Sequence, residues 1–172
     1  MKRMHKLVEA ELNSAFWKWF KGSKVVDSSG QPLIVFHWTN SKFNTFELSS
    51  TGSNNDYGMW GKGFYFSPIR KFGRGYGSNI MEVYLSLQNP LIVRKISQLP
   101  PNLKPVIGRE NALELRNNLI ALGYDGVFQY EGGERKPWTQ IVAFYPNQIK
   151  SAISNNGDYS RSDNINEQFY GA

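Results

Sequence analysis

The chain is divided into short apolar runs, rich in β-branched and aromatic residues, that are separated by polar loops dense in Ser, Gly and Asn. Runs of this length are typical of buried strands. Helical spacing of apolar residues occurs at 4–20 and at 110–122, and Gly123 stands where a glycine commonly closes a helix. The pattern predicts an α+β fold. We expect strands at 33–36, 63–66, 81–87, 91–93, 126–130 and 140–144.

The length of the chain limits its domain organisation. A chain of 172 residues with 40% hydrophobic content can bury one core and is too short for two full domains. We therefore expect a single domain over 1–172, with an amphipathic N-terminal helix region at 1–24 that packs against the body. Residues 155–172 are rich in Asn, Ser, Asp and Gly, and we expect much of this polar tail to be mobile.

Several classes of protein are disfavoured by residues that the sequence lacks. There is no cysteine and there are two histidines, so a disulfide framework is excluded and a metal enzyme is disfavoured. No run approaches the roughly 18 apolar residues of a membrane span, and the start lacks the pattern of a secretory signal. We expect no membrane association and a cytoplasmic location, in the producing cell or, for an effector, in a target cell.

The positive charge of the chain is concentrated in its body. The net charge is +6, and the last 22 residues carry −2, which leaves +8 on residues 1–150. Such a balance favours phosphate-bearing ligands, whether a dinucleotide, a nucleic acid or an acidic protein face. A simply solvated surface explains the same charge equally well.

Two pieces of the sequence carry residues suited to chemistry. His37 follows the apolar run at 33–36, and a polar loop leads from there to Gly61-Lys-Gly-Phe-Tyr-Phe66. Each piece alone has an ordinary structural explanation, because a lone histidine at a strand end is usually hydrogen-bonded in place and Gly-x-Gly before an aromatic is commonly a tight turn. No helix follows directly, so the glycines are not a Rossmann dinucleotide fingerprint.

The order and spacing of several motifs resemble the diphtheria-toxin-like branch of ADP-ribosyltransferases, which includes the poly(ADP-ribose) polymerases and has a His-Tyr-Glu triad. His37-Trp38-Thr39 looks like their first motif, 61–66 looks like their Gly-Lys-Gly-aromatic-Tyr-Phe segment, and Tyr76 matches a further tyrosine. Their last strand, which opens with Glu, is similar to the strand that opens here with Gln140. Stretches at 23–27, 84–91, 123–126 and 146–151 extend the likeness over roughly 16–165, as in the ADP-ribosyltransferase domain of phage and mobile-element polyvalent proteins.

The resemblance implies a split β-sheet core, NAD⁺ as co-substrate and no metal. It implies that His37 bonds a ribose hydroxyl of the adenosine half and that Thr39 supports that strand. The backbone beside His37 would pair with the nicotinamide carboxamide, and Trp38 stands there in place of the usual glycine. Tyr65 and Tyr76 would lie against the two faces of the nicotinamide ring, and Gly63 would belong to the same cofactor-binding set.

Gln140 stands where the family has its catalytic carboxylate. That carboxylate would hold the 2′-hydroxyl of the ribose and place negative charge near a developing oxocarbenium ion, whereas glutamine is neutral. Three interpretations stay open. Gln140 is a substitution that silences a toxic enzyme, which we favour, or a natural variant with low or altered activity, or a sign that Glu131 or Glu134 supplies the charge.

The acceptor of ADP-ribose is the least constrained part of the function. Single-unit transfer is favoured, because chain growth needs the missing glutamate. Arg70, Lys71 and Arg74, together with Glu131 and Glu134, are candidate acceptor-binding residues for a protein, RNA or DNA. The likeness favours a toxin or a phage or bacterial effector, for which an antitoxin or immunity protein is an expected partner. The alternative is an inactive module that binds NAD⁺, nucleic acid or protein.

Overall fold

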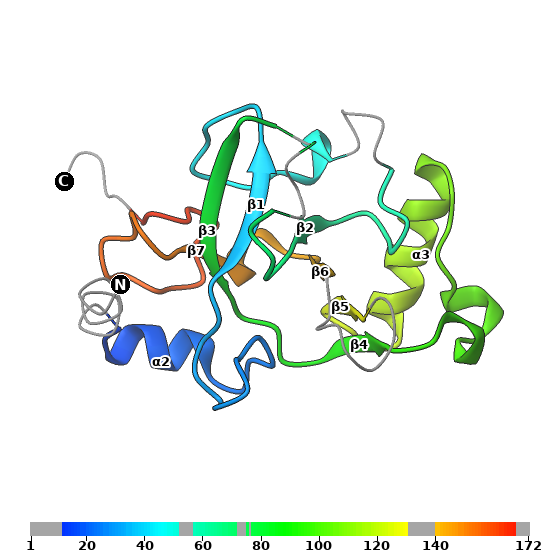
Figure 1. Cartoon of the computed structure of the whole chain (residues 1–172), viewed down its shortest axis with the longest axis horizontal. Helices are drawn as coiled ribbons and strands as arrows, with labels where there is room; N and C mark the ends of the chain where they lie inside the picture. Colours follow the sequence, from blue (N-terminus) through cyan, green and yellow to red (C-terminus); the bar gives the residue numbers. More distant parts are fainter. Residues whose placement is uncertain (1–11, 52–56, 72–74, 76, 131–139, 168–172) are drawn as a thin grey trace.

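The protein consists of two β-sheets packed face to face, with one helix on the outer side of each sheet (Figure 1). The computed structural model describes residues 12–51, 57–71, 75, 77–130 and 140–167. This is an α+β arrangement, as the alternation of short apolar runs and two helical stretches predicts. Within the described part of the chain, no helix is long and apolar enough to cross a membrane.

The first sheet has the strand order β1-β3-β7 and is antiparallel throughout. Its strands are β1 (Val35–Thr39), β3 (Asn79–Leu85) and β7 (Ile149–Ser151). β1 begins two residues later than expected, because the N–H of Leu33 donates to the carbonyl of Val25 and so closes a separate turn. His37 consequently lies in the middle of β1 and not at its end, which corrects the sequence prediction.

The second sheet has the strand order β2-β6-β5-β4. Its strands are β2 (Phe64–Phe66), β6 (Gln140–Ala143), β5 (Gly126–Gln129) and β4 (Pro90–Val93). The β4–β5 pair is parallel, and α3 (Arg109–Ala121) lies between these two strands in the chain. Gly123 follows α3 with φ of +90°, the left-handed conformation that ends many helices. Four 3₁₀ helices complete the described part, η1 (Leu48–Ser50), η2 (Ile96–Gln98), η3 (Pro101–Leu103) and η4 (Pro146–Gln148).

Backbone hydrogen bonds join the two sheets where β1 meets the end of β2. The N–H of Phe36 donates to the carbonyl of Ser67 at 2.8 Å, and the N–H of Ser67 donates to the carbonyl of Phe36 at 3.0 Å. The main hydrophobic core fills the space between the two sheets. Residues of this core include Val35, Phe46, Phe64, Phe66, Val83, Leu85, Phe128, Ile141 and Ile149, all buried.

The helices cover the outer faces of the sheets and lie at opposite ends of the molecule (Figure 1). α2 (Ser14–Phe20) starts at Asn13, whose side chain accepts from the N–H of Phe16 at 2.9 Å. Phe16 packs against Tyr84 of β3 and against Tyr159. The predicted helix at 4–20 is therefore seen over its last turns, and its part at 4–11 lies outside the described residues.

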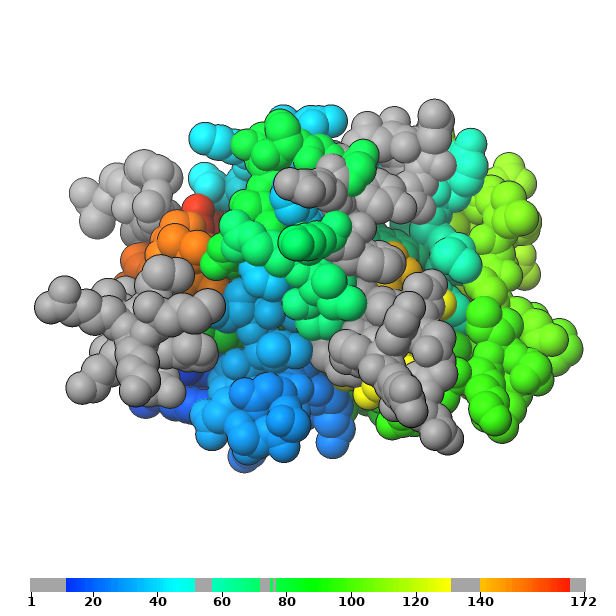
Figure 2. Space-filling view, viewed as in Figure 1, coloured from blue at the N-terminus to red at the C-terminus, as the bar shows by residue number. Residues whose placement is uncertain are grey.

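Residues 155–167 of the polar tail make many bonds to the body. Lys150 of β7 has a fully buried side chain that forms an ion pair with the almost fully buried Glu167 and donates to the carbonyl of Ser162 at 2.6 Å. Tyr159 and Ile165 are also buried. The last described residues, coloured orange to red, are visible at the surface on the left of the molecule in Figure 2. Mobility of the tail at 155–172 stays a prediction, and 168–172 lie outside the described residues.

Candidate functional site

Three of the predicted site residues lie on strands that meet where the two sheets are joined. His37 is on β1, Tyr65 on β2 and Gln140 on β6. In β2, Phe66 pairs with Ile141, the neighbour of Gln140, and the next residue, Ser67, pairs with Phe36, the neighbour of His37. The register of the strands therefore brings His37, Tyr65 and Gln140 into one region, although His37 and Gln140 are more than a hundred residues apart in the chain.

His37 is held by one polar bond and three aromatic rings. Its Nδ1 lies 2.8 Å from the carbonyl oxygen of Tyr65. Because a carbonyl oxygen only accepts, Nδ1 carries the proton in this bond and Nε2 is the acceptor of the neutral ring. The ring centroids of Phe46 and Phe66 lie 5.1 and 5.4 Å away, and that of Phe43 lies 6.3 Å away. Burial lowers the pKa of His37, partly opposed by the bond to Tyr65, so the imidazole is neutral at pH 7.

Tyr65 is fixed through its hydroxyl group. The hydroxyl donates to the carbonyl of Gly61 at 2.6 Å and accepts from the N–H of Trp60 at 3.1 Å. Its ring packs at the edge of the core between the second sheet and α3. Gly63, in the same turn, has no space for a side chain, because a Cβ there would lie 2.7 Å from the Val142 side chain. Glycine at 63 is thus required for the close approach of β2 and β6.

Trp38 and Thr39 follow His37 on β1 and make local bonds. The indole N–H of Trp38 donates to the carbonyl of Arg70 at 2.7 Å, so the indole leans toward the segment after β2. The hydroxyl of Thr39 accepts from the N–H of Ser41 at 3.1 Å, which stabilises the turn that leaves β1. Both side chains are partly exposed at the end of the strand.

The cationic residues predicted for acceptor binding differ in whether they contact other residues of the protein. Arg70 forms an ion pair with Glu82 at 2.8 Å, and its guanidinium lies 5.5 Å from the centroid of the Phe36 ring. Its side chain is 58% exposed, so one edge still faces solvent. Lys71 is exposed. The other acceptor-binding candidates, Arg74, Glu131 and Glu134, lie outside the described residues, as does Tyr76, which was predicted to bind the cofactor.

The structure adds two site neighbours that sequence reasoning missed, Trp60 and Gln129. Gln129 of β5 is directly opposite Gln140 of β6, and its side-chain oxygen accepts from the indole N–H of Trp60 at 2.6 Å. Both residues are buried, with Trp60 at 0% and Gln129 at 5% exposure. In the sequence, Gln129 is a single amide at the end of an apolar strand, and a buried amide is rare unless it has a hydrogen-bond partner.

Arg116 of α3 supports the turn that precedes Tyr65. Its guanidinium donates to the carbonyl of Lys62 at 3.0 Å and lies over the rings of Phe144 and Tyr145. Burial lowers the pKa of Arg116, opposed in part by Tyr145, and the guanidinium stays charged at neutral pH. The Gly61–Gly63 turn is therefore held by α3 on one side and by the Tyr65 hydroxyl on the other.

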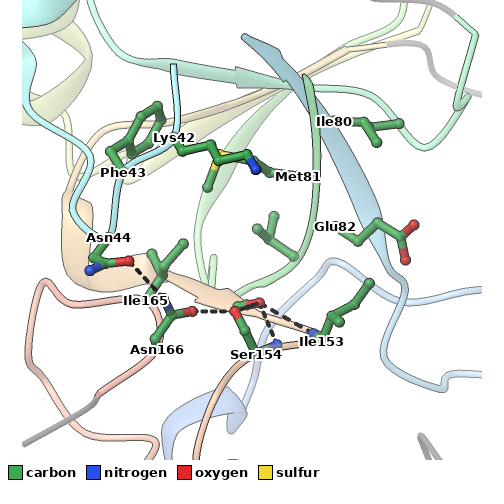
Figure 3. Close-up of a pocket in the computed structure, with 12 residues that line it drawn as sticks. Lys42, Phe43, Asn44, Ile80, Met81, Glu82, Ile153, Ser154, Ile165 and Asn166 are labelled. Carbon is green, nitrogen blue, oxygen red and sulfur yellow. Dashed lines mark hydrogen bonds between the residues drawn. The ribbon is translucent and has the colours of Figure 1, made fainter. Parts of the chain in front are cut away.

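A pocket of about 420 Å³ lies elsewhere, along β3 beyond the end of the short β7 (Figure 3). Its lining includes Lys42, Ile153 and Asn166, and the close-up shows Asn44, Asn166 and Ser154 joined by hydrogen bonds along one wall. None of the predicted site residues that the structure describes lines this pocket. Among the described residues there is no group of three or more His, Cys, Asp or Glu side chains placed to hold a metal ion.

Comparison with known proteins places the chain in a family. No curated protein matches the chain. A crystal structure of an anti-CRISPR protein is similar to it at 13% identity with a TM-score of 0.39, covering 67% of this chain and 90% of that protein. The family described as ADP-ribosyltransferase in polyvalent proteins matches residues 27–159, which include β1, β2 and β6 with His37, Tyr65 and Gln140. Because the match spans most of the chain, the protein belongs to this family of ADP-ribosyltransferases.

Proposed function

We propose that the protein is an NAD⁺-dependent mono-ADP-ribosyltransferase whose activity is reduced by Gln140. The observation that carries this proposal is the meeting of β1, β2 and β6, which brings His37, Tyr65 and Gln140 into one region. These are the positions at which the sequence resembles the His-Tyr-Glu triad. The match to an ADP-ribosyltransferase family over 27–159 supports the general reaction.

The reaction breaks the bond between nicotinamide and C1′ of the ribose. Nicotinamide leaves as a neutral group with the bonding electrons, and a nucleophilic atom of the acceptor forms the new bond to C1′ and releases its proton. In the proposed site the fixed ring of Tyr65 offers a face for stacking. The neutral His37 has an acceptor nitrogen for a ribose hydroxyl, and its orientation is set by the bond to the Tyr65 carbonyl.

The reduced activity that we propose follows from the neutral side chain of Gln140. A carboxylate at the start of β6 would stabilise the positive charge that develops on the ribose, and an amide of nearly the same shape does not. Loss of one such contact commonly lowers the rate by about a hundred- to a thousandfold. We favour Gln140 as a substitution that silences the enzyme; a natural low-activity form and a charge supplied by Glu131 or Glu134 are the alternatives.

The decisive test is nicotinamide release from NAD⁺ by the protein and by Gln140→Glu. We expect Gln140→Glu to raise the rate by about a hundred- to a thousandfold. The matched control is Gln98→Glu, which makes the same chemical change at an exposed position in η2. An equal rate in all three proteins would contradict the proposal.

For the acceptor we propose a protein or a nucleic acid, modified by a single ADP-ribose unit, in the setting of a toxin or phage effector with an antitoxin or immunity protein as partner. The +8 charge of residues 1–150 and the exposed Lys71 support an anionic acceptor surface. If the acceptor is a nucleic acid, its affinity falls steeply with rising salt. Affinity that is independent of salt rules out this class of acceptor.

A second candidate function is a binding module without catalysis, and Gln140 favours it. A neutral side chain at position 140 can still bond a ribose hydroxyl, so NAD⁺ binding survives the loss of charge. Calorimetric titration of NAD⁺ into both Gln140→Glu and the unaltered protein separates the two functions. Binding to both proteins with no nicotinamide release from either supports the module, whereas release by Gln140→Glu supports the transferase.

A further inference from the structure

The strand β3 has an open edge along its first half. β7 ends at Ser151, which is paired with Val83 of β3. The next residue, Ala152, still donates its N–H to the carbonyl of Glu82 at 2.9 Å. No further described residue pairs with β3 on this side, so the stretch at 79–82 has a neighbouring strand on one side alone, which is β1.

Backbone groups along this open edge are unpaired. In an antiparallel sheet, successive residues of a strand direct their N–H and C=O alternately to the two sides. The bond from Ala152 shows that Glu82 is directed to the open side, so Ile80, two residues earlier, is directed there as well. Met81, between them, pairs with His37 of β1. Among the described residues, nothing bonds the N–H of Glu82 or the N–H and C=O of Ile80.

The pocket of about 420 Å³ lies against this edge. Figure 3 shows Ile80 and Glu82 on one side of the cavity and the segment at 42–44 on the other. Ile165, which is 3% exposed, contributes an apolar surface to the lining, and Ile153, which is 67% exposed, forms an apolar rim. The cavity therefore continues the lane of β7 beside β3 and is lined by apolar groups next to the unpaired backbone.

No residue at 79–82 protects the edge against pairing. Exposed edges of native sheets are commonly protected by lysine, proline or a bulge, and this stretch reads Asn-Ile-Met-Glu. The carboxylate of Glu82 is neutralised by Arg70 at 2.8 Å. The remaining charge in the lining is Lys42, which is exposed and forms no ion pair with a described residue. The charge of the pocket therefore favours an acidic ligand.

We propose that this pocket binds an extended, acidic peptide segment of another protein, which adds a strand to the free edge of β3. The backbone of the peptide pairs with Ile80 and Glu82, and its alternate side chains lie on the apolar lining. An acidic side chain of the peptide meets Lys42. A second copy of the chain fits less well, because the open stretch is short and faces the wall at 42–44, which leaves room for a single strand.

This peptide site is separate from the proposed transferase site, so its test requires no turnover of NAD⁺. The probe is a phage-displayed library of random linear peptides, selected against the unaltered protein. We expect the selected peptides to alternate apolar and polar residues and to carry Asp or Glu. Fluorescence anisotropy then measures the affinity of one selected peptide for the protein and for its variants.

Two substitutions address the edge and the charge separately. Ile80→Pro removes an N–H from the open side and none from the ladder with β1, and should lower the affinity about tenfold. Lys42→Glu should lower the affinity by about three- to tenfold through repulsion of the acidic side chain. Lys95→Glu makes the same change in charge at an exposed position before η2 and should leave the affinity unchanged.

Amide hydrogen exchange locates the bound peptide without any substitution in the protein. A saturating peptide should slow exchange at Ile80 and Glu82 by about tenfold or more, and should leave Met81, which is bonded to β1, unchanged. The matched controls are two copies of the peptide that are N-methylated at its odd or at its even residues. One edge of an added strand pairs with β3, so one of the two copies should lose its affinity and the other should keep it.

Several outcomes would overturn the peptide site. These are the selection of no peptide, an affinity that is equal in folded Ile80→Pro, in Lys42→Glu and in the unaltered protein, or slowed exchange at residues other than Ile80 and Glu82. A dimer of the free protein that Ile80→Pro dissociates would assign the edge to a second copy. If Ile80→Pro does not fold, exchange at Ile80 and Glu82 decides. A peptide bound at this edge while Gln140→Glu releases no nicotinamide supports the site and contradicts the transferase alone.

Discussion

Lys150 and Glu167 form an ion pair in which the two side chains are 0% and 2% exposed. The amine also donates to the carbonyls of Ser162 and Asn164, at 2.6 and 3.2 Å, so β7 is bonded to the segment that follows it. Burial lowers the pKa of Lys150, and its bond to Glu167 opposes that change. The pair therefore keeps its charge only as long as both partners are present.

Replacing Glu167 with Gln should lower the free energy of unfolding by about 3–5 kcal/mol, because it leaves the buried Lys150 amine without its counter-ion. Urea denaturation followed by fluorescence measures this change. The comparison is Glu82→Gln, which breaks the exposed ion pair with Arg70 and should lower stability by less than about 1 kcal/mol. Equal effects of the two substitutions would contradict a stabilising role of the buried pair.

His37 should make the stability of the protein fall at acidic pH. Its pKa in the folded state is lowered from 6.5 by burial, so the unfolded chain binds the proton more tightly. Stability is therefore lost as pH falls from about 7 through the unfolded value toward the folded one. His37→Gln keeps a donor for the Tyr65 carbonyl and does not titrate. Urea denaturation at pH 7.5 and 5.5 should show a smaller loss in His37→Gln than in the unaltered protein; equal losses would exclude His37 as the cause.

Tyr65→Phe should lower the free energy of unfolding by about 1–3 kcal/mol, because the N–H of Trp60 and the carbonyl of Gly61 lose the hydroxyl they share. Tyr65→Phe keeps the aromatic ring that we expect to stack on nicotinamide. When it is combined with Gln140→Glu, the free energy of NAD⁺ binding should therefore change less than the free energy of unfolding does. Tyr57→Phe removes a hydroxyl from a ring that is 40% exposed and serves as the control. Thermal denaturation and NAD⁺ titration of the two variants measure these effects.

Replacing both Glu131 and Glu134 with Ala should leave any residual nicotinamide release unchanged, because we attribute the missing charge to position 140. Glu110→Ala with Glu114→Ala removes the same charge from exposed positions on α3 and controls for the change in net charge. Complete loss of release in the first double variant alone would show that a loop carboxylate acts in place of the one at 140.

The local sequence pattern predicted where the helices and strands lie in the chain better than which strands pair with each other. The helix at 110–122 and the strands at 126–130 and 140–144 agree with α3, β5 and β6 to within a residue or two. Apolar periodicity and the glycine that ends α3 are local signals, so they can be interpreted without the fold. β7 was missed, because its three residues include Lys150, a charged residue that only the ion pair with Glu167 allows to be buried.

The sequence by itself determined the α+β class. The order of its motifs also gave the resemblance to ADP-ribosyltransferases, which the family match over 27–159 confirms. It also singled out His37, Tyr65 and Gln140, whose roles stay predictions. Only the tertiary structure decided that β1 meets β2 at Phe36 and Ser67, and that Gln129 faces Gln140 with Trp60 behind it. Strand pairing and buried hydrogen bonds join residues far apart in the chain, and their free energy depends on which groups are removed from water together, which no local pattern records.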